Sequence, residues 1–219
     1  MLTGQVRHLK PTAQCDYEWY GNPHAGFYVC PQLLDENSIV YSFGIGEDVS
    51  FDLEIIAKHK CQVYGFDPTP KSINWVGQQE LPGNFHFYKY GIHSESGFVD
   101  FFLPKNKAYV SGSLMIQNNV DTGRKVSVEM KSIGDIVREL GHDHIDVLKM
   151  DIEGSEYDVI DSILKANLSI TQLLIEFHDR FFEDGRERTR RAIGQLKAGG
   201  FEVFAVSDSF EEVSLVYRG

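Results

Sequence analysis

The sequence contains few cysteines and no long hydrophobic run. Its 219 residues include only Cys15, Cys30 and Cys61, and no two of these have CxxC spacing. So small and odd a number argues against a disulfide framework and against a structural zinc site, and we expect reduced thiols. No apolar run approaches the ~18–20 residues of a membrane span, and no apolar signal-peptide core follows Met1. These absences predict a cytoplasmic protein with no membrane span.

Positive charge is also scarce. Lys and Arg number 21 against 32 Asp and Glu, which gives a formal net charge of −11. Because a nucleic-acid partner requires a basic surface that neutralises phosphates, we expect no such partner. Hydrophobic residues make up 42% of the chain and charged residues 24%, which is typical of a folded globular protein rather than a disordered one.

The chain divides into two segments by its patterning. Residues 1–35 contain several aromatic residues and prolines, but their apolar residues show no long periodic spacing. No Gly/Ser linker follows them. We therefore expect residues 1–35 to form an irregular N-terminal arm or cap, which packs on a main domain of residues 36–219.

Strands and helices alternate through the main domain. The expected strands are 38–43, 61–66, 84–90, 97–103, 125–130, 145–150, 172–177, 201–207 and 213–217, and the expected helices are 49–58, 71–79, 132–140, 156–166 and 187–198. This alternation implies right-handed crossovers and a mainly parallel sheet. Only about five residues separate the last two strands, too few for a parallel crossover, so the closing pair must be antiparallel.

A glycine turn follows the first strand of the main domain, at the end of the sheet where α/β proteins bind ligands. Gly44 and Gly46 permit a tight turn and the close approach of a ligand to the backbone. Val49 stands where the dinucleotide fingerprint GxGxxG has its third glycine, and Glu47 and Asp48 would repel a pyrophosphate but attract a cation. The turn therefore argues against a nicotinamide dehydrogenase; a purely structural turn is the alternative.

Asp67 ends the second strand of the main domain, 23 residues after Gly44. A carboxylate about 20 residues beyond such a turn accepts hydrogen bonds from ribose hydroxyls. The alternative is a simple Asp-Pro turn with Pro68. Together with the glycine turn, Asp67 favours an adenosyl ligand without a pyrophosphate, and S-adenosylmethionine, with its ribose and sulfonium cation, fits this description.

Three carboxylates, those of Asp151, Glu153 and Glu156, crowd the end of strand 145–150 and the start of the next helix. Such crowding is costly unless a cation or a proton lies among the carboxylates, which indicates a functional site. The alternative is that Asp151 and Glu153 only cap the helix.

Glu176 and His178 follow the next strand, two residues apart and therefore on one side of an extended segment. We expect them to bind an acceptor or to serve as its base. With Asp151 and Glu153 they also offer oxygen and nitrogen ligands for a divalent metal, an option that the sequence alone does not favour. For His178 the alternative is a solvated loop histidine.

Three segments, VYSFGIGEDVSFD, GFDPTPKSI and LKMDIEGSEYDVI, together resemble the FkbM-type S-adenosylmethionine-dependent methyltransferases. The resemblance spans residues 26–218, and the DxEGxE motif at Asp151–Glu156 is its most specific part. It implies an α/β class I methyltransferase (Rossmann-like) fold: a seven-stranded, mainly parallel sheet with an antiparallel C-terminal strand and helices on both faces. It also implies S-adenosylmethionine as cofactor and O-methylation of a hydroxyl on a sugar, glycan or secondary metabolite.

The resemblance also assigns roles to individual residues. By resemblance, the cofactor would be surrounded by Gly44, Ile45, Gly46, Glu47 and Asp48 at its methionine part, Asp67, Pro68 and Thr69 at its ribose, Ile92 and His93 at its adenine, and Asp151 at the methyl-transfer site. In the irregular stretch 105–124 we expect Tyr109 and Ser113 to close over the cofactor.

For the reaction we expect His178 or Asp151 to act as base, oriented by Glu153 and Glu176. Two other functions stay open: a non-catalytic adenosyl-ligand-binding or interaction module on the same fold, and a metal-dependent methyltransferase. The acceptor, the oligomeric state and the role of the arm are not specified by these patterns.

Overall fold

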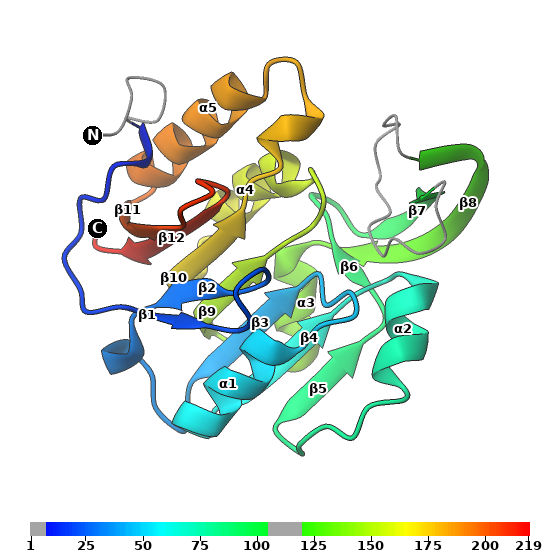
Figure 1. Ribbon diagram of the computed structural model, residues 1–219, viewed down its shortest axis with the longest axis horizontal. Helices are drawn as coiled ribbons and strands as arrows, with labels where there is room; N and C mark the ends of the chain where they lie inside the picture. The colour runs from blue at the N-terminus through cyan, green and yellow to red at the C-terminus, as the bar shows by residue number, and fades with distance from the viewer. Residues whose placement is uncertain (1–7, 105–119) are drawn as a thin grey trace.

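A seven-stranded sheet forms the centre of the computed structural model, which describes residues 8–104 and 120–219 (Figure 1). The strands lie in the order β11 (Phe201–Val206), β12 (Glu212–Tyr217), β10 (Ser169–Glu176), β9 (His144–Met150), β3 (Ile39–Phe43), β4 (Gln62–Phe66) and β5 (Phe85–Tyr88). β10, β9, β3, β4 and β5 are parallel, whereas β12 is antiparallel to both β10 and β11. The predicted mainly parallel sheet with an antiparallel C-terminal strand is confirmed.

Helices cover both faces of this sheet. They are α1 (Ser50–His59), α2 (Pro70–Val76), α3 (Ile133–Leu140), α4 (Glu156–Lys165) and α5 (Gly185–Ala198). Side chains alternate between the faces of a strand, and β9 shows this directly. Val147 belongs to the apolar cluster that holds buried residues of α1 and α2, and Leu148 belongs to the cluster that holds those of α3, α4 and α5. The carboxyl ends of the parallel strands lie between these two layers of helices and are not covered by them, which leaves one edge of the sheet open.

Capping residues set where the helices near this open edge begin. Thr69 precedes α2 and accepts a hydrogen bond from the backbone N–H of Ser72 through its side chain, and Pro70 fills the first helical position, where no N–H is needed. Ser132 caps α3 in the same way, and α3 ends at Gly141 in the left-handed conformation. The helices and strands expected from residue 38 onward are present, with ends shifted by a few residues.

The N-terminal segment is more regular than expected. Its antiparallel hairpin of β1 (Glu18–Tyr20) and β2 (Phe27–Val29) is followed by a 3-10 turn, η2 (Pro31–Leu33). Tyr20, Phe27 and Val29 are buried in the same cluster as residues of α1. The expectation of an irregular arm was wrong at these positions, because a strand of three residues is too short to show a period. The division into an arm and a main domain stays a prediction.

A disulfide joins Cys15 to Cys30 across this hairpin. The expectation of reduced thiols was therefore wrong for these two cysteines, while Cys61 is a buried free thiol. Disulfides are typical of oxidising compartments, so the bond removes one reason for expecting a cytoplasmic protein. No helix in the described ranges is long and apolar enough to cross a membrane.

A second, three-stranded sheet projects to one side of the main sheet (Figure 1). It consists of β6 (Gly91–Ile92), β8 (Val120–Lys131) and β7 (Gly97–Pro104), with β8 parallel to β6 and antiparallel to β7. Residues 120–124, expected to be irregular, belong to β8, so that expectation was wrong there. Tyr109 and Ser113 lie outside the described residues.

Candidate functional site

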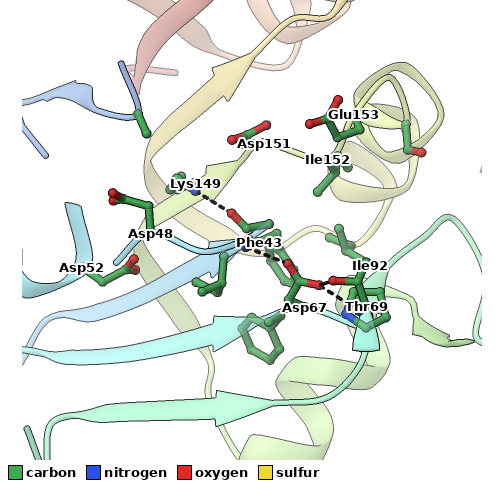
Figure 2. Close-up of a pocket in the computed structure, with 18 of the residues that line it drawn as sticks. Phe43, Asp48, Asp52, Asp67, Thr69, Ile92, Lys149, Asp151, Ile152 and Glu153 are labelled. Atoms are coloured by element: carbon green, nitrogen blue, oxygen red, sulfur yellow. Dashed lines mark hydrogen bonds between the residues drawn. The ribbon is translucent and has the colours of Figure 1, made fainter. Parts of the chain in front are cut away.

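A cavity of about 240 Å³ lies at the carboxyl ends of β3, β4 and β9 (Figure 2). Its lining includes Gly44, Ile45, Gly46, Glu47, Asp48, Asp67, Pro68, Thr69, Ile92, Asp151 and Glu153. All the predicted cofactor residues are in this set except His93. His93 follows the last residue of β6, and its Nδ1 atom lies 3.3 Å from the hydroxyl oxygen of Ser94.

The glycine turn after β3 touches the loop after β9 through backbone atoms. Gly44 has a φ of +82°, and a Cβ built there would lie 1.7 Å from the carbonyl oxygen of Asp151. The backbone N–H of Asp151 in turn donates a hydrogen bond to the carbonyl of Phe43, at 3.1 Å. Only glycine satisfies both the conformation and the contact. The two loops that line the cavity are therefore held at a fixed separation.

Asp67 connects the glycine turn to the loop after β4 and is almost fully buried. Its Oδ2 accepts a hydrogen bond from the backbone N–H of Gly46 at 2.9 Å, and its Oδ1 accepts from the backbone N–H and the hydroxyl of Thr69 at 2.8 and 2.6 Å. A carboxylate has about four acceptor positions, so these bonds leave one for a ligand hydroxyl. The hydrogen bonds also show that Asp67 supports the turn itself.

The two acids of the glycine turn are held by neighbours. Glu47 forms an ion pair with Lys71 at 3.0 Å. Asp48 accepts hydrogen bonds from the backbone N–H and hydroxyl of Ser50, at 2.8 and 2.5 Å, and from the side-chain amide of Asn22 at 2.8 Å. Asn22 lies in the N-terminal hairpin, so the arm fixes one wall of the cavity. Nothing in the composition of residues 1–35 predicted this contact.

Two charged residues that the sequence analysis missed also line the cavity, namely Asp52 and Lys149. Both are buried, and the Lys149 ammonium donates a hydrogen bond to the carbonyl oxygen of Gly44 at 3.1 Å. Burial raises the pKa of the Asp52 carboxyl, and the positive charge of Lys149 opposes that rise. The available signal was a lysine near the end of the apolar run IDVLKM, where a buried strand leaves no room for an unpaired charge.

The structure brings the four predicted catalytic residues together, with the three acids around His178. The Nε2 atom of His178 lies 3.4 Å from Glu176 Oε1, 3.6 Å from Asp151 Oδ1 and 3.6 Å from Glu153 Oε2. Asp151 and Glu153 line the cavity across from Asp67, as Figure 2 shows. The His178 side chain is only 1% exposed, so the alternative of a solvated loop histidine was wrong.

A fourth carboxylate fixes the orientation of this imidazole. The Nδ1 atom of His178 lies 2.9 Å from Glu156 Oε1, and the Glu156 side chain is fully buried. The same oxygen accepts hydrogen bonds from the backbone N–H groups of Ile152 and Gly154, at 3.1 and 3.2 Å. Glu156 thus holds the loop after β9 and turns Nε2 toward the other three acids.

These surroundings shift the pKa values of His178 and Glu176. Burial on its own would lower the pKa of His178, but the hydrogen bond to Glu156 and the charges of Glu156, Asp151 and Glu176 raise it to about 9. Burial and the negative charge of Asp151 raise the pKa of Glu176 to about 8, against the opposing charge of His178. At neutral pH the imidazole is therefore a cation, and Glu176 carries a proton for much of the time.

The fold and the position of the cavity are those of the class I methyltransferase fold. The seven-stranded sheet has the antiparallel last strand of that class, and a glycine turn and an acidic residue follow adjacent parallel strands. The chain belongs to the methyltransferase FkbM domain family, whose sequence model matches residues 13–203.

Individual relatives agree with this assignment. A probable methyltransferase-like protein 24 from Homo sapiens is 27% identical over 154 residues, 69% of this chain and 36% of that protein. The hexuronic acid methyltransferase AglP of Haloferax volcanii is 24% identical over 125 residues, 56% of this chain and 50% of that protein. The chain thus spans half or less of the length of these curated relatives.

A solved structure shows the same fold. The crystal structure of methyltransferase FkbM from Methylobacillus flagellatus matches 90% of this chain and 48% of its own chain, with 14% identity and a TM-score of 0.55. At that identity the likeness establishes the shared fold.

Proposed function

We propose that this chain transfers the methyl group of S-adenosylmethionine to a hydroxyl of a sugar, glycan or secondary-metabolite acceptor. The observation that carries the proposal is a single cavity with Asp67 on one side and Asp151 and Glu153, two of the acids around His178, on the other. Membership of the FkbM domain family supports methyl transfer. The name of the Haloferax relative, a hexuronic acid methyltransferase, supports a sugar acceptor.

The cavity suits the cofactor at three points. The remaining acceptor position of Asp67 is available to a ribose hydroxyl. The apolar side chains of Ile92 and Met130 form a surface for the adenine. Asp48 and Asp52 place negative charge near the methionine part, whose ammonium and sulfonium groups are cationic.

The reaction is an in-line displacement. The acceptor oxygen attacks the methyl carbon, the O–C bond forms as the S–C bond breaks, and the bonding pair returns to sulfur, which leaves the neutral thioether S-adenosylhomocysteine. Positioning of the two reactants supplies ~7–11 kcal/mol of the barrier. The hydroxyl proton passes to Asp151, since the carboxylate of Asp151 lines the cavity, whereas His178, with a pKa of about 9, is already protonated at neutral pH. Glu153 and Glu176 orient that site.

Calorimetric titration with S-adenosylhomocysteine tests cofactor binding. We expect saturable binding to the wild type and none of NAD or ATP under the same conditions. Asp67→Ala should weaken binding by about tenfold or more, because it removes a charged acceptor and the support of the glycine turn, each worth ~1.5 kcal/mol or more. An unchanged affinity in the variant would refute the role of Asp67. No binding to the wild type would favour an interaction module on this fold.

Turnover of Asp151→Asn tests the base. An acceptor that the wild type methylates should react ~10²–10⁴-fold more slowly with the variant, because the amide takes no proton. The affinity for S-adenosylhomocysteine should stay near that of the wild type, which separates chemistry from binding. Full turnover by Asp151→Asn would show that another group accepts the proton.

A further inference from the structure

The carboxylates around His178 form a geometry that the methyl-transfer chemistry does not by itself require. Asp151, Glu153 and His178 each offer one ligand atom, and these atoms all lie within 4.8 Å of one another. We propose that these three side chains bind a divalent metal ion at the acceptor side of the cavity. The role of the ion in methyl transfer rests on the proposed function. Binding of the ion to these three side chains does not depend on that function.

The distances from His178 Nε2 to the two carboxylates are closer to the spacing of two ligands of one ion than to the length of a hydrogen bond. His178 Nε2 is 3.6 Å from both Asp151 Oδ1 and Glu153 Oε2. Hydrogen bonds of this kind are normally ~2.7–3.2 Å long. Two atoms that each lie ~2.1–2.5 Å from one ion, at right angles, are ~3.0–3.5 Å apart. The three groups therefore surround a space of about the right size for a cation.

A buried carboxylate behind the imidazole is an independent observation that points to a cation. Metal-bound histidines almost always give their other ring N–H to a carboxylate or a carbonyl, which fixes the tautomer and aims the free nitrogen at the ion. Glu156 makes this contact with Nδ1 at 2.9 Å. Its second oxygen, Oε2, is buried and has no hydrogen-bond partner among the described residues. A carboxylate oxygen left this way is costly, and positive charge close by, on the imidazole or on an ion bound to its Nε2 atom, offsets that cost.

The local charges agree with this. Four acidic side chains, those of Asp151, Glu153, Glu156 and Glu176, face one imidazole, and of these Glu176 carries a proton for much of the time. Arg180 lies 3.6 Å from Glu176, makes its shorter ion pair with Glu211, at 2.7 Å, and also exerts its positive charge on Glu153. With the imidazole protonated the group still has an excess of negative charge. A divalent ion would reduce it by taking the place of the Nε2 proton, which is released to solvent, so that the neutral imidazole becomes a ligand.

The ligand set indicates both the ion and the acceptor. Two carboxylates and one imidazole suit a first-row divalent ion such as Mn²⁺, and three protein ligands leave coordination positions open. An acceptor hydroxyl bound there becomes more acidic, so the second oxygen of Asp151 takes its proton more readily. Acceptors with two adjacent oxygens, such as a sugar diol or a hydroxyl beside a carboxylate, would chelate the ion and be preferred.

Electron paramagnetic resonance of free Mn²⁺ tests the binding, on the full chain treated with EDTA, dialysed and kept without cofactor. We expect one Mn²⁺ per chain. Glu153→Gln and Asp151→Asn should each raise the Kd about tenfold or more, as judged from the 10–100-fold cost of losing even an outer-shell partner. Both side chains are partly exposed, so the variants should fold, which circular dichroism would check. Glu187→Gln, on the exposed surface of α5, is the matched control and should bind Mn²⁺ as the wild type does.

The outcomes for the metal and for methyl transfer separate cleanly. Absence of Mn²⁺ binding up to millimolar concentration, or equal binding by Glu153→Gln and the wild type, overturns the metal site. In either case, S-adenosylhomocysteine binding in EDTA still supports the proposed function. Mn²⁺ binding without S-adenosylhomocysteine binding would overturn methyl transfer and leave the metal site standing. With both bound, turnover should be lost in EDTA and restored by Mn²⁺, and full turnover in EDTA would show that the ion has no part in the reaction.

Discussion

His178 and Glu176 lie side by side in a buried site, and each holds a proton more tightly than it would in water. The raised pKa values follow from different causes: the neighbouring acids stabilise the imidazolium, while burial and Asp151 destabilise the carboxylate of Glu176. For both groups there is therefore a range of pH in which the native state keeps a proton that the unfolded chain has already released.

This linkage predicts how stability depends on pH. The native state holds the additional proton of Glu176 between about pH 4.5 and 8, and that of His178 between about pH 6.5 and 9. The free energy of unfolding of the EDTA-treated protein should therefore fall as pH rises, most steeply between about pH 6.5 and 8, where both groups act. Urea unfolding at a series of pH values measures it. Glu176→Gln should flatten the fall and Glu187→Gln should not; equal slopes in the two variants would contradict the assignment.

Sequence reasoning located single residues well where they follow a strand. Asp67, Asp151 and Glu153 do so, and the topology of a parallel sheet then brings them to one edge. Asp52 was missed because it lies inside a helix, where its direction depends on how α1 packs on the sheet. His93 follows the two-residue strand β6 and is not among the residues that line the cavity, so its contact with the cofactor stays a prediction.

At the scale of elements, the N-terminal hairpin joins the main sheet to the cavity. The backbone N–H of Asn22 donates to the hydroxyl of Ser50 at 2.9 Å, and its side-chain amide donates to Asp48 at 2.8 Å. The loop between β1 and β2 thus holds the start of α1 and one acid of the glycine turn. The periodicity of the sequence gives no sign of this, because the contact joins positions 26 residues apart through side chains.

Removing the Asn22 amide should therefore weaken cofactor binding. Asn22→Ala loses the hydrogen bond to the Asp48 carboxylate, and hydrogen bonds to charged groups are worth ~1.5–3 kcal/mol. Because the effect on the cofactor is indirect, we expect only part of this energy, about a threefold to tenfold higher Kd for S-adenosylhomocysteine by calorimetry. Asn37→Ala, at an exposed asparagine just beyond the N-terminal segment, serves as control. Equal affinities in the two variants would show that the hairpin does not support the glycine turn.

At the scale of the whole molecule, the hairpin and the main sheet share one apolar cluster. Tyr20 and Phe27 are buried with Val40 of β3 and Phe51 of α1. The alternation of strands and helices was enough to predict a mainly parallel sheet with an antiparallel closing pair, since short connections leave few topologies. The disulfide was not predictable in this way, because sequence spacing does not show which cysteines meet. The expected absence of a nucleic-acid partner, drawn from the net charge of −11, stays a prediction.

The shared core predicts a single unfolding transition. Trp19 lies in β1 and the other tryptophan, Trp75, lies in α2, so Trp75→Phe makes fluorescence a reporter of the hairpin. In urea, this fluorescence and the far-ultraviolet circular dichroism should change together. Reduction of Cys15–Cys30, whose partners are 15 residues apart, should lower the free energy of unfolding by ~3 kcal/mol and leave one transition. An earlier fluorescence change would show that residues 1–35 unfold independently.

The backbone contact between Gly44 and Asp151 restricts how a chain of this kind can diversify. Any side chain at Gly44 would have to displace the carbonyl of Asp151, so a library that randomises this position should return glycine almost alone. A new acceptor specificity cannot then arise by moving these two loops apart. It has to come from segments outside their contact, and the three-stranded sheet that carries Met130 at the edge of the cavity is the part best placed to vary.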